Sequence, residues 1–279
     1  MLNVKFGACE FALPGNNVGS IKLAKEIGLQ GLQLGFVSDG NTRGYKLAQK
    51  WFRDYYMEEC GKYGIQLPSM AVCEFDTYGL KNPKSTEKGK MAWEVIDLAI
   101  DTAAYMKMEM IMMPSFNDGF IETDEDLDIT AEALTYACKE AAKHGIVITT
   151  ENLLTMDKNL ELVGKVNQPN LSGFYDSQNY WCNLRWKQVP MLEQLIENDL
   201  LYPEIHVKDG IESADSSKML GQGDTDFYGT MDVLKKHDYT GWIHLENFYD
   251  RLPLRERASG YNYIDLAKED LEILKAACR

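Results

Sequence analysis

Short apolar runs rich in β-branched residues alternate with longer amphipathic stretches along the whole 279-residue chain. The short runs have the length of buried strands, and the longer stretches repeat apolar residues every three or four positions, as helices do. We predict strands at 3–8, 31–36, 65–73, 109–113, 146–151, 171–176, 203–207 and 242–246. We predict helices near 17–28, 45–63, 85–106, 124–143, 157–167, 186–199, 228–237 and 263–277.

The stretch 124–143 shows the helical pattern most clearly. Acidic residues occupy its first turn, where they face the positive end of the helix dipole. Apolar side chains then recur at helical spacing through Leu127, Leu134 and Cys138. Gly145 follows, and glycine suits the left-handed residue just beyond a helix end.

Strict alternation of strand and helix implies parallel strands joined by right-handed crossovers. Eight such units fit closure into a (β/α)8 TIM barrel, and a barrel of this kind takes about 250 residues. We therefore expect one domain over 1–279. An open doubly wound sheet is the alternative, but the glycine-rich nucleotide-binding motifs typical of that fold are absent.

The chain carries a formal net charge of −14 and no run of basic residues, which disfavours a nucleic-acid partner. Six cysteines show no metal-binding or disulfide spacing. No apolar run is long enough for a membrane span, and the first residues lack the features of a signal peptide. We expect a cytoplasmic protein that acts on a small molecule.

Four late strands end on side chains that can bind a metal ion: Glu151, Asp176, His206 and Glu246. In a parallel barrel the carboxyl ends of the strands form the active-site face, so these four would converge there. Three carboxylates and one imidazole suit Mn²⁺ best, with Mg²⁺, Co²⁺ or Zn²⁺ as alternatives. Each residue also has a structural interpretation, since Asp176 resembles a helix cap and His206 a core histidine. Four in successive strands favour one divalent-cation site.

The series of motifs at the strand ends resembles the xylose-isomerase-like barrel superfamily, which includes sugar-phosphate isomerases/epimerases and ketose 3-epimerases. The matching segments are TTENL at 149–153, FYDSQN at 174–179, IHVKDG at 205–210, GQGDTDF at 221–227 and YTGWIHLEN at 239–247. The resemblance places the family's four metal ligands on the same four residues. It also implies that Glu151 and Glu246 form the acid/base pair.

Two positions near these ligands concern the substrate. Many relatives carry a histidine where this chain has Asn179, and in ketose epimerases that position contacts the substrate. Several ketose epimerases also carry an arginine shortly after the metal-binding histidine, which is absent here. Lys208 either neutralises the site and contacts the substrate or pairs with Asp209; the sequence leaves both interpretations open.

The expected chemistry is removal and return of a proton next to a carbonyl group, by two carboxylates on opposite sides of the reacting carbon. A cation would stabilise the enediolate. A dehydratase or lyase acting on a keto-sugar, keto-inositol or keto-glycoside would use the same site, and a non-catalytic sugar-binding barrel is the non-enzyme alternative. The few histidines and the acidic charge argue against an apurinic endonuclease. Relatives are often dimers or tetramers, so a homo-oligomer is a further expectation.

Overall fold

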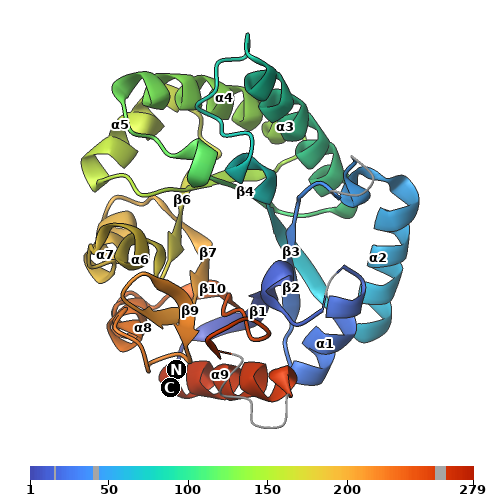
Figure 1. Cartoon of the computed structure of the whole chain (residues 1–279), viewed down its shortest axis with the longest axis vertical. Coiled ribbons are helices and arrows are strands. Elements are labelled where there is room, and N and C mark those ends of the chain that lie inside the picture. Colours follow the sequence, from blue (N-terminus) through green and yellow to red (C-terminus); the bar gives the residue numbers. More distant parts are fainter. Residues whose placement is uncertain (16, 40–43, 255–261) are drawn as a thin grey trace. The chain divides into compact units, whose positions relative to one another are not determined.

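The computed structural model describes residues 1–15, 17–39, 44–254 and 262–279. Parallel strands hydrogen-bond in the closed order β1-β10-β7-β6-β5-β4-β3-β2, with the labels of Figure 1. Their bounds are β1 Asn3–Cys9, β2 Gly31–Gly35, β3 Gln66–Ala71, β4 Met110–Pro114, β5 Val147–Glu151, β6 Leu171–Asp176, β7 Leu201–Val207 and β10 Thr240–Leu245. The predicted (β/α)8 barrel is confirmed, and each predicted strand is present to within two residues at either end.

The α-helices follow the strands as predicted. Their bounds are α1 Gly19–Ile27, α2 Lys50–Tyr63, α3 Glu87–Met106, α4 Asp124–Ala142, α5 Met156–Val166, α6 Asn179–Leu184, α7 Val189–Glu197, α8 Phe227–Lys236 and α9 Tyr263–Ala277. Among the residues that the structure describes, no helix has the length and apolarity needed to cross a membrane.

A hairpin and a short helix that follow β7 and β6 were not predicted. An antiparallel hairpin follows β7, with strands β8 (Asp209–Ile211) and β9 (Ala214–Lys218). Both strands are short and polar, so they lack the apolar alternation that marks a strand in sequence. The short helix α6 lies ahead of the predicted helix α7, and Arg185 in the left-handed conformation ends it.

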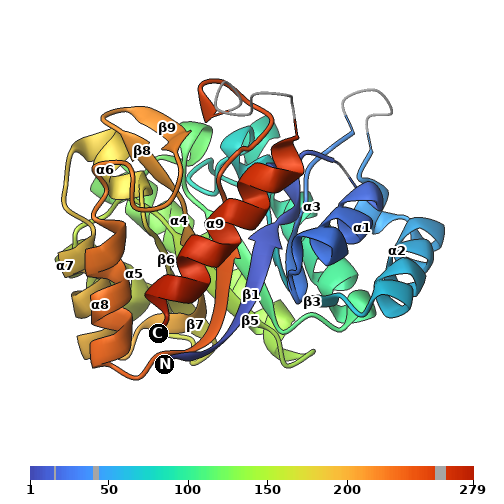
Figure 2. The ribbon, with the colours of Figure 1, turned by 90° about the horizontal axis from the view of Figure 1, so that it is seen from below.

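The chain forms two compact units, whose boundaries fall within β2, α2, β3 and β6. The first unit consists of Met1–Gln33, Glu59–Gln66 and Tyr175–Arg279. In it β10 pairs with both β1 and β7, and β1 pairs with β2. Figure 2 shows α9 between α8 and α1. The chain ends meet where the backbone N–H of Leu2 donates to the carbonyl of Cys278 at 2.9 Å.

The second unit consists of Leu34–Glu58 and Leu67–Phe174. Its strands β3, β4 and β5 pair in order, and every residue of β4 is buried. Helix α4 begins with a capping box in which the side chains of Thr123 and Asp126 each accept from the other's backbone N–H. Gly145 has a φ of 72°, as expected for the residue that ends this helical segment.

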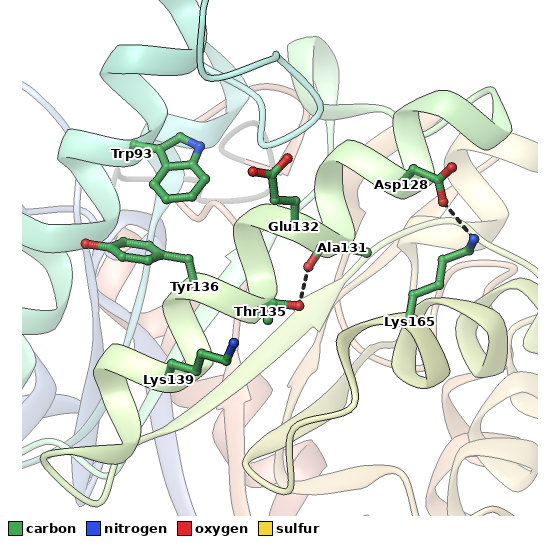
Figure 3. A pocket seen from close by; sticks show the side chains of 8 residues that line it. All are labelled: Trp93, Asp128, Ala131, Glu132, Thr135, Tyr136, Lys139 and Lys165. Atoms are coloured by element: carbon green, nitrogen blue, oxygen red, sulfur yellow. Dashed lines mark hydrogen bonds and ion pairs between the residues drawn. The ribbon is translucent and has the colours of Figure 1, made fainter.

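The outer faces of α3, α4 and α5 enclose a shallow groove of about 460 Å³ in the second unit (Figure 3). Trp93 and Tyr136 stand on one side of it, with ring centroids 4.5 Å apart. On the other side Nζ of Lys165 pairs with Oδ1 of Asp128 at 2.7 Å. None of the predicted site residues lines this groove.

Candidate metal centre

The end of β7 and the end of β10 bring His206 and Glu246 together in the first unit. The register of the two strands sets Val207 opposite Leu245, and Glu246 continues the pairing by donating its N–H to the carbonyl of Val207 at 3.0 Å. Nδ1 of His206 lies 3.2 Å from Oε2 of Glu246. His206 is fully buried and Glu246 is 8% exposed, so this contact is shielded from solvent.

Asp176, at the end of β6, uses its two carboxylate oxygens differently. Oδ1 accepts from the backbone N–H groups of Gln178 and Asn179, both at 2.7 Å, and so holds the turn into α6. Oδ2 is buried and accepts no hydrogen bond from any residue that the structure describes. Nζ of Lys208 lies 3.5 Å from it. Oδ1 therefore acts as the predicted helix cap, and Oδ2 is available to a ligand.

Lys208 lies among the acids of the site. Its Nζ is 2.8 Å from Oε2 of Glu246 and 3.7 Å from Oδ1 of Asp215, in addition to the contact with Asp176. The side chain is only 5% exposed. Of the two interpretations that the sequence left open, charge neutralisation at the site is the one the geometry favours; a substrate contact stays a prediction.

Asp209 is occupied elsewhere. Its Oδ2 accepts from the backbone N–H of Gly223 at 3.0 Å, and its Oδ1 accepts from Oγ1 of Thr225 at 2.7 Å. A Cβ at position 223 would lie 2.1 Å from Oδ1 of Asp209, so only glycine fits there. The HVKD and GQGDTDF motifs are thus joined by hydrogen bonds that fix the loop after β9.

The electrostatics of the two acids differ because Lys208 lies nearer to Glu246. Burial raises the pKa of Asp176 to about 7; Lys208 and His206 oppose that rise, and the charge of Glu246 adds to it. Burial also acts to raise the pKa of Glu246, but Lys208 and His206 outweigh it and hold that pKa well below its usual range. Glu246 is therefore ionised at neutral pH, whereas burial disfavours the charged form of Asp176.

These groups fit a divalent cation. Asp176 offers a buried oxygen without a hydrogen bond, and a positive ion there would relieve the cost of its charge. His206 and Glu246 add a nitrogen and an oxygen, the donor types that Mn²⁺ accepts. Cys9, at the end of β1, was not predicted; one ligand atom from each of Cys9, His206 and Glu246 lies within 4.8 Å of the others.

The remaining predicted residues occupy the expected elements. Glu151 ends β5 in the second unit and is 5% exposed; its backbone carbonyl accepts from the N–H of Ser115 at 2.8 Å. Asn179 begins α6 and is half-buried, and its backbone carbonyl accepts from Nδ2 of Asn183 at 2.9 Å. The roles assigned to both residues stay predictions.

The strands also contain a buried polar set, of which the sequence analysis missed Gln33 and Glu204. It comprises Gln33 on β2, Glu204 on β7 and His244 on β10, each at most 1% exposed. The only sequence signal was a polar residue inside an otherwise apolar strand, as in GLQLG at 31–35. Such a residue must find a buried hydrogen-bond partner, which the sequence alone does not identify.

Comparison with known proteins gives matches along most of the chain. Residues 21–277 match the family model described as xylose isomerase-like TIM barrel. The 2-epi-5-epi-valiolone 7-phosphate 2-epimerase of Actinoplanes sp. is 25% identical over 237 residues, which cover 84% of this chain and 83% of that protein.

Solved structures with similar folds include two epimerases. The D-allulose 3-epimerase of Methylomonas sp., in complex with D-allulose, superposes with a TM-score of 0.73 at 16% identity, covering 99% of this chain and 98% of that one. The 3-keto-D-glucoside 4-epimerase of E. coli has a TM-score of 0.71 at 17% identity, covering 98% and 100%. At these identities the two structures support the fold alone.

Proposed function

Because the chain belongs to the xylose isomerase-like TIM barrel family, we propose that it is a divalent-metal-dependent isomerase or epimerase of a sugar or sugar phosphate. The observation that carries the proposal is the buried group of Asp176, His206 and Glu246, with Lys208 among them. Buried titratable groups gathered at the ends of barrel strands are typical of an active site.

Asp176, His206 and Glu246 would hold the cation together with Glu151. Support for Glu151 comes from strand order, since β5 pairs in parallel with β6 and sets Thr150 opposite Gly173. Glu151 therefore ends its strand at the same edge as Asp176 does. When bound, the ion would polarise the substrate carbonyl and stabilise negative charge on its oxygen. Mn²⁺ is the ion we propose.

Glu151 and Glu246 would remove and return the proton at the carbon next to the carbonyl. Glu246 is held ionised chiefly by Lys208, so it would enter the reaction without a proton. Asp176 and His206 would serve as anchors for the ion. Lys208 would limit the repulsion among the carboxylates, and Asn179, at the start of α6, would contact the substrate.

The Actinoplanes relative supports an epimerase. The Actinoplanes relative is named as a 2-epimerase of a 7-phosphate, and the two solved structures are named as epimerases of D-allulose and of a 3-keto-D-glucoside. Epimerisation beside a carbonyl requires the proton transfer described above. The substrate panel should therefore contain free ketoses, ketose phosphates and keto-glycosides.

The test is deuterium uptake from D₂O into each candidate substrate, with Mn²⁺ supplied and the products identified by NMR. Uptake at the carbon next to the carbonyl is expected, and Glu246→Gln should reduce it by about 100-fold or more because one proton carrier is lost. Glu197→Gln, at the exposed end of α7, is the matched control and should retain the wild-type rate.

Other outcomes separate the alternatives. Loss of a leaving group instead of return of the proton would identify a lyase that uses the same residues. Binding of a sugar without any exchange would indicate a sugar-binding barrel. Full turnover by Glu246→Gln with metal bound would contradict the assignment of the two glutamates.

A further inference from the structure

From His206 toward the centre of the strands runs a continuous set of buried polar contacts, two of which are hydrogen bonds. Nε2 of His206 and Oε1 of Gln33 are 2.8 Å apart. Nε2 of Gln33 donates to Oε1 of Glu204 at 3.1 Å. Nε2 of His244 lies 2.9 Å from that same oxygen of Glu204. All four side chains are buried, so their partners are set by one another rather than by solvent.

The amide of Gln33 determines which group donates and which accepts along this set. An amide has one side that accepts and one that donates. Glu204 accepts from the Nε2 side of Gln33, so the Oε1 side faces His206. Reversing the amide would put its oxygen against the Glu204 carboxylate and its NH₂ group against the imidazole, with the loss of both hydrogen bonds.

We propose that Gln33 is a positioning residue, which holds hydrogen on Nε2 of His206 and so leaves Nδ1 to bind the cation. Oε1 of Gln33 can only accept, so the ring nitrogen that faces it must donate. Nδ1 then points to the other side of the ring, where it lies 3.2 Å from Oε2 of Glu246. A histidine ligand is commonly fixed in this way by the partner of its other nitrogen. The inference rests on the proposed metal site.

Neighbouring residues pack closely around His244. Trp242 stacks on His244, with ring centroids 5.5 Å apart and an interplanar angle of 17°. Gly7 leaves room for the imidazole of His244, because a Cβ there would lie 2.4 Å from Nδ1. Glu204 therefore lies between a closely packed imidazole and the amide of Gln33.

Cys9 lies beside the same set. The register of β1 with β2 places Cys9 opposite Gln33, and Sγ is 3.3 Å from Nε2 of His206 and 3.9 Å from Oε1 of Gln33. A thiol is a much weaker hydrogen-bond partner than an amide. Gln33 is therefore the group that decides which nitrogen of His206 carries the hydrogen.

The first test measures Mn²⁺ binding by calorimetry, without substrate. Gln33→Met has similar length but cannot accept from His206, so its Mn²⁺ affinity should fall by about 10–100-fold. Gln66→Met, at the exposed start of β3, makes the same chemical change away from the site and should bind as wild type does. Wild-type affinity in a folded Gln33→Met would overturn the proposal.

A reciprocal exchange separates polarity from packing. Gln33→Glu alone should bind Mn²⁺ weakly, because it places a carboxylate against Glu204. Combined with Glu204→Gln, it restores an acceptor that faces His206 and a donor between positions 33 and 204. The double variant should recover affinity to within a few-fold of wild type. A double variant that folds but binds no better than Gln33→Glu would also overturn the proposal.

The second test uses NMR to determine which ring nitrogen of His206 carries the hydrogen. Two-bond ¹H–¹⁵N spectra distinguish the two neutral tautomers, and loss of one set of signals in His206→Ala assigns this ring among the four histidines. We expect the Nε2–H pattern in the wild-type protein loaded with diamagnetic Zn²⁺, and a mixed or reversed pattern in Gln33→Met. An Nδ1–H pattern in the wild type would refute the proposal. If the wild type bound neither Mn²⁺ nor Zn²⁺, the proposed function would fail, whereas the pattern in the ion-free protein would still judge Gln33.

Discussion

At the scale of single residues, Lys208 balances the charge of the buried acids. It is the cation nearest to both Asp176 and Glu246 among the contacts of the site, and its side chain is almost fully buried. A buried ion pair contributes little net stability, but removal of one partner leaves the other charge uncompensated. The effect of Lys208 should therefore depend on whether another positive charge is present.

Lys208→Met is expected to lower the free energy of unfolding by about 3–5 kcal/mol without added metal. With saturating Mn²⁺ the loss should shrink, because the ion supplies positive charge beside the same carboxylates. Thermal unfolding with and without Mn²⁺ measures this difference. Lys236→Met removes an exposed pair with Glu193 and should leave the free energy of unfolding nearly unchanged in both conditions. If Lys208→Met lost the same free energy of unfolding with and without Mn²⁺, Lys208 would not balance the charge of the proposed metal ligands.

At the scale of elements, the strands that form the barrel were predictable because their apolar residues have no alternative to burial. The positions of Asp176, His206 and Glu246 were predictable because each lies at the carboxyl end of such a strand. The hairpin β8–β9 was not predictable, because its polar residues are ordered by side-chain contacts such as that of Asp209 with Gly223. Gln33 and Cys9 were missed because they lie far from His206 in the sequence. They contact it only through the pairing of the barrel strands.

The loop after β9 depends on the absence of a side chain at Gly223. Gly223→Ala would place a Cβ 2.1 Å from Oδ1 of Asp209 and 2.4 Å from the carbonyl oxygen of Gly210. We expect a loss of about 1–3 kcal/mol in the free energy of unfolding, as for other overpacked sites. Denaturant titration measures it.

Gly164→Ala is the matched control for that change. Gly164 lies within α5, and a Cβ there meets nothing within 4 Å. Alanine is favoured over glycine in a helix by about 0.5–1 kcal/mol, so this variant should be more stable than the wild type. Equal effects of the two substitutions would mean that the contact between Gly223 and Asp209 does not constrain the loop.

At the scale of the whole molecule, Asp270 joins the last helix to the segments that carry the site. From α9 its Oδ1 accepts from the N–H of Leu220 at 2.9 Å, and its Oδ2 accepts from Nδ2 of Asn247 at 2.7 Å. Asn247 follows Glu246 directly. Burial raises the pKa of Asp270 from 3.8 to about 6, although these hydrogen bonds oppose the rise.

This shift predicts a pH dependence of stability. Between pH 4 and pH 6 the folded state retains the proton of Asp270 and the unfolded state does not, so this residue's contribution to stability falls as the pH rises. A shift from 3.8 to about 6 corresponds to about 3 kcal/mol. Asp270→Asn does not titrate, so its free energy of unfolding minus that of the wild type should increase by up to this amount from pH 4 to pH 7. If the difference in free energy of unfolding between the two proteins stayed constant with pH, the raised pKa of Asp270 would be contradicted.

Asp176 gives the site a mechanical connection to the loops around it. Its carboxylate is one rigid plane, so any rotation that serves Oδ2 also moves Oδ1, which holds the turn into α6. Helix α6 carries Trp181, whose Nε1 donates to Oδ1 of Asp224 at 2.6 Å, and Asp224 accepts in turn from the N–H of Glu212 between β8 and β9. A rotation of this carboxylate would therefore be transmitted through α6 to the contact between Trp181 and Asp224.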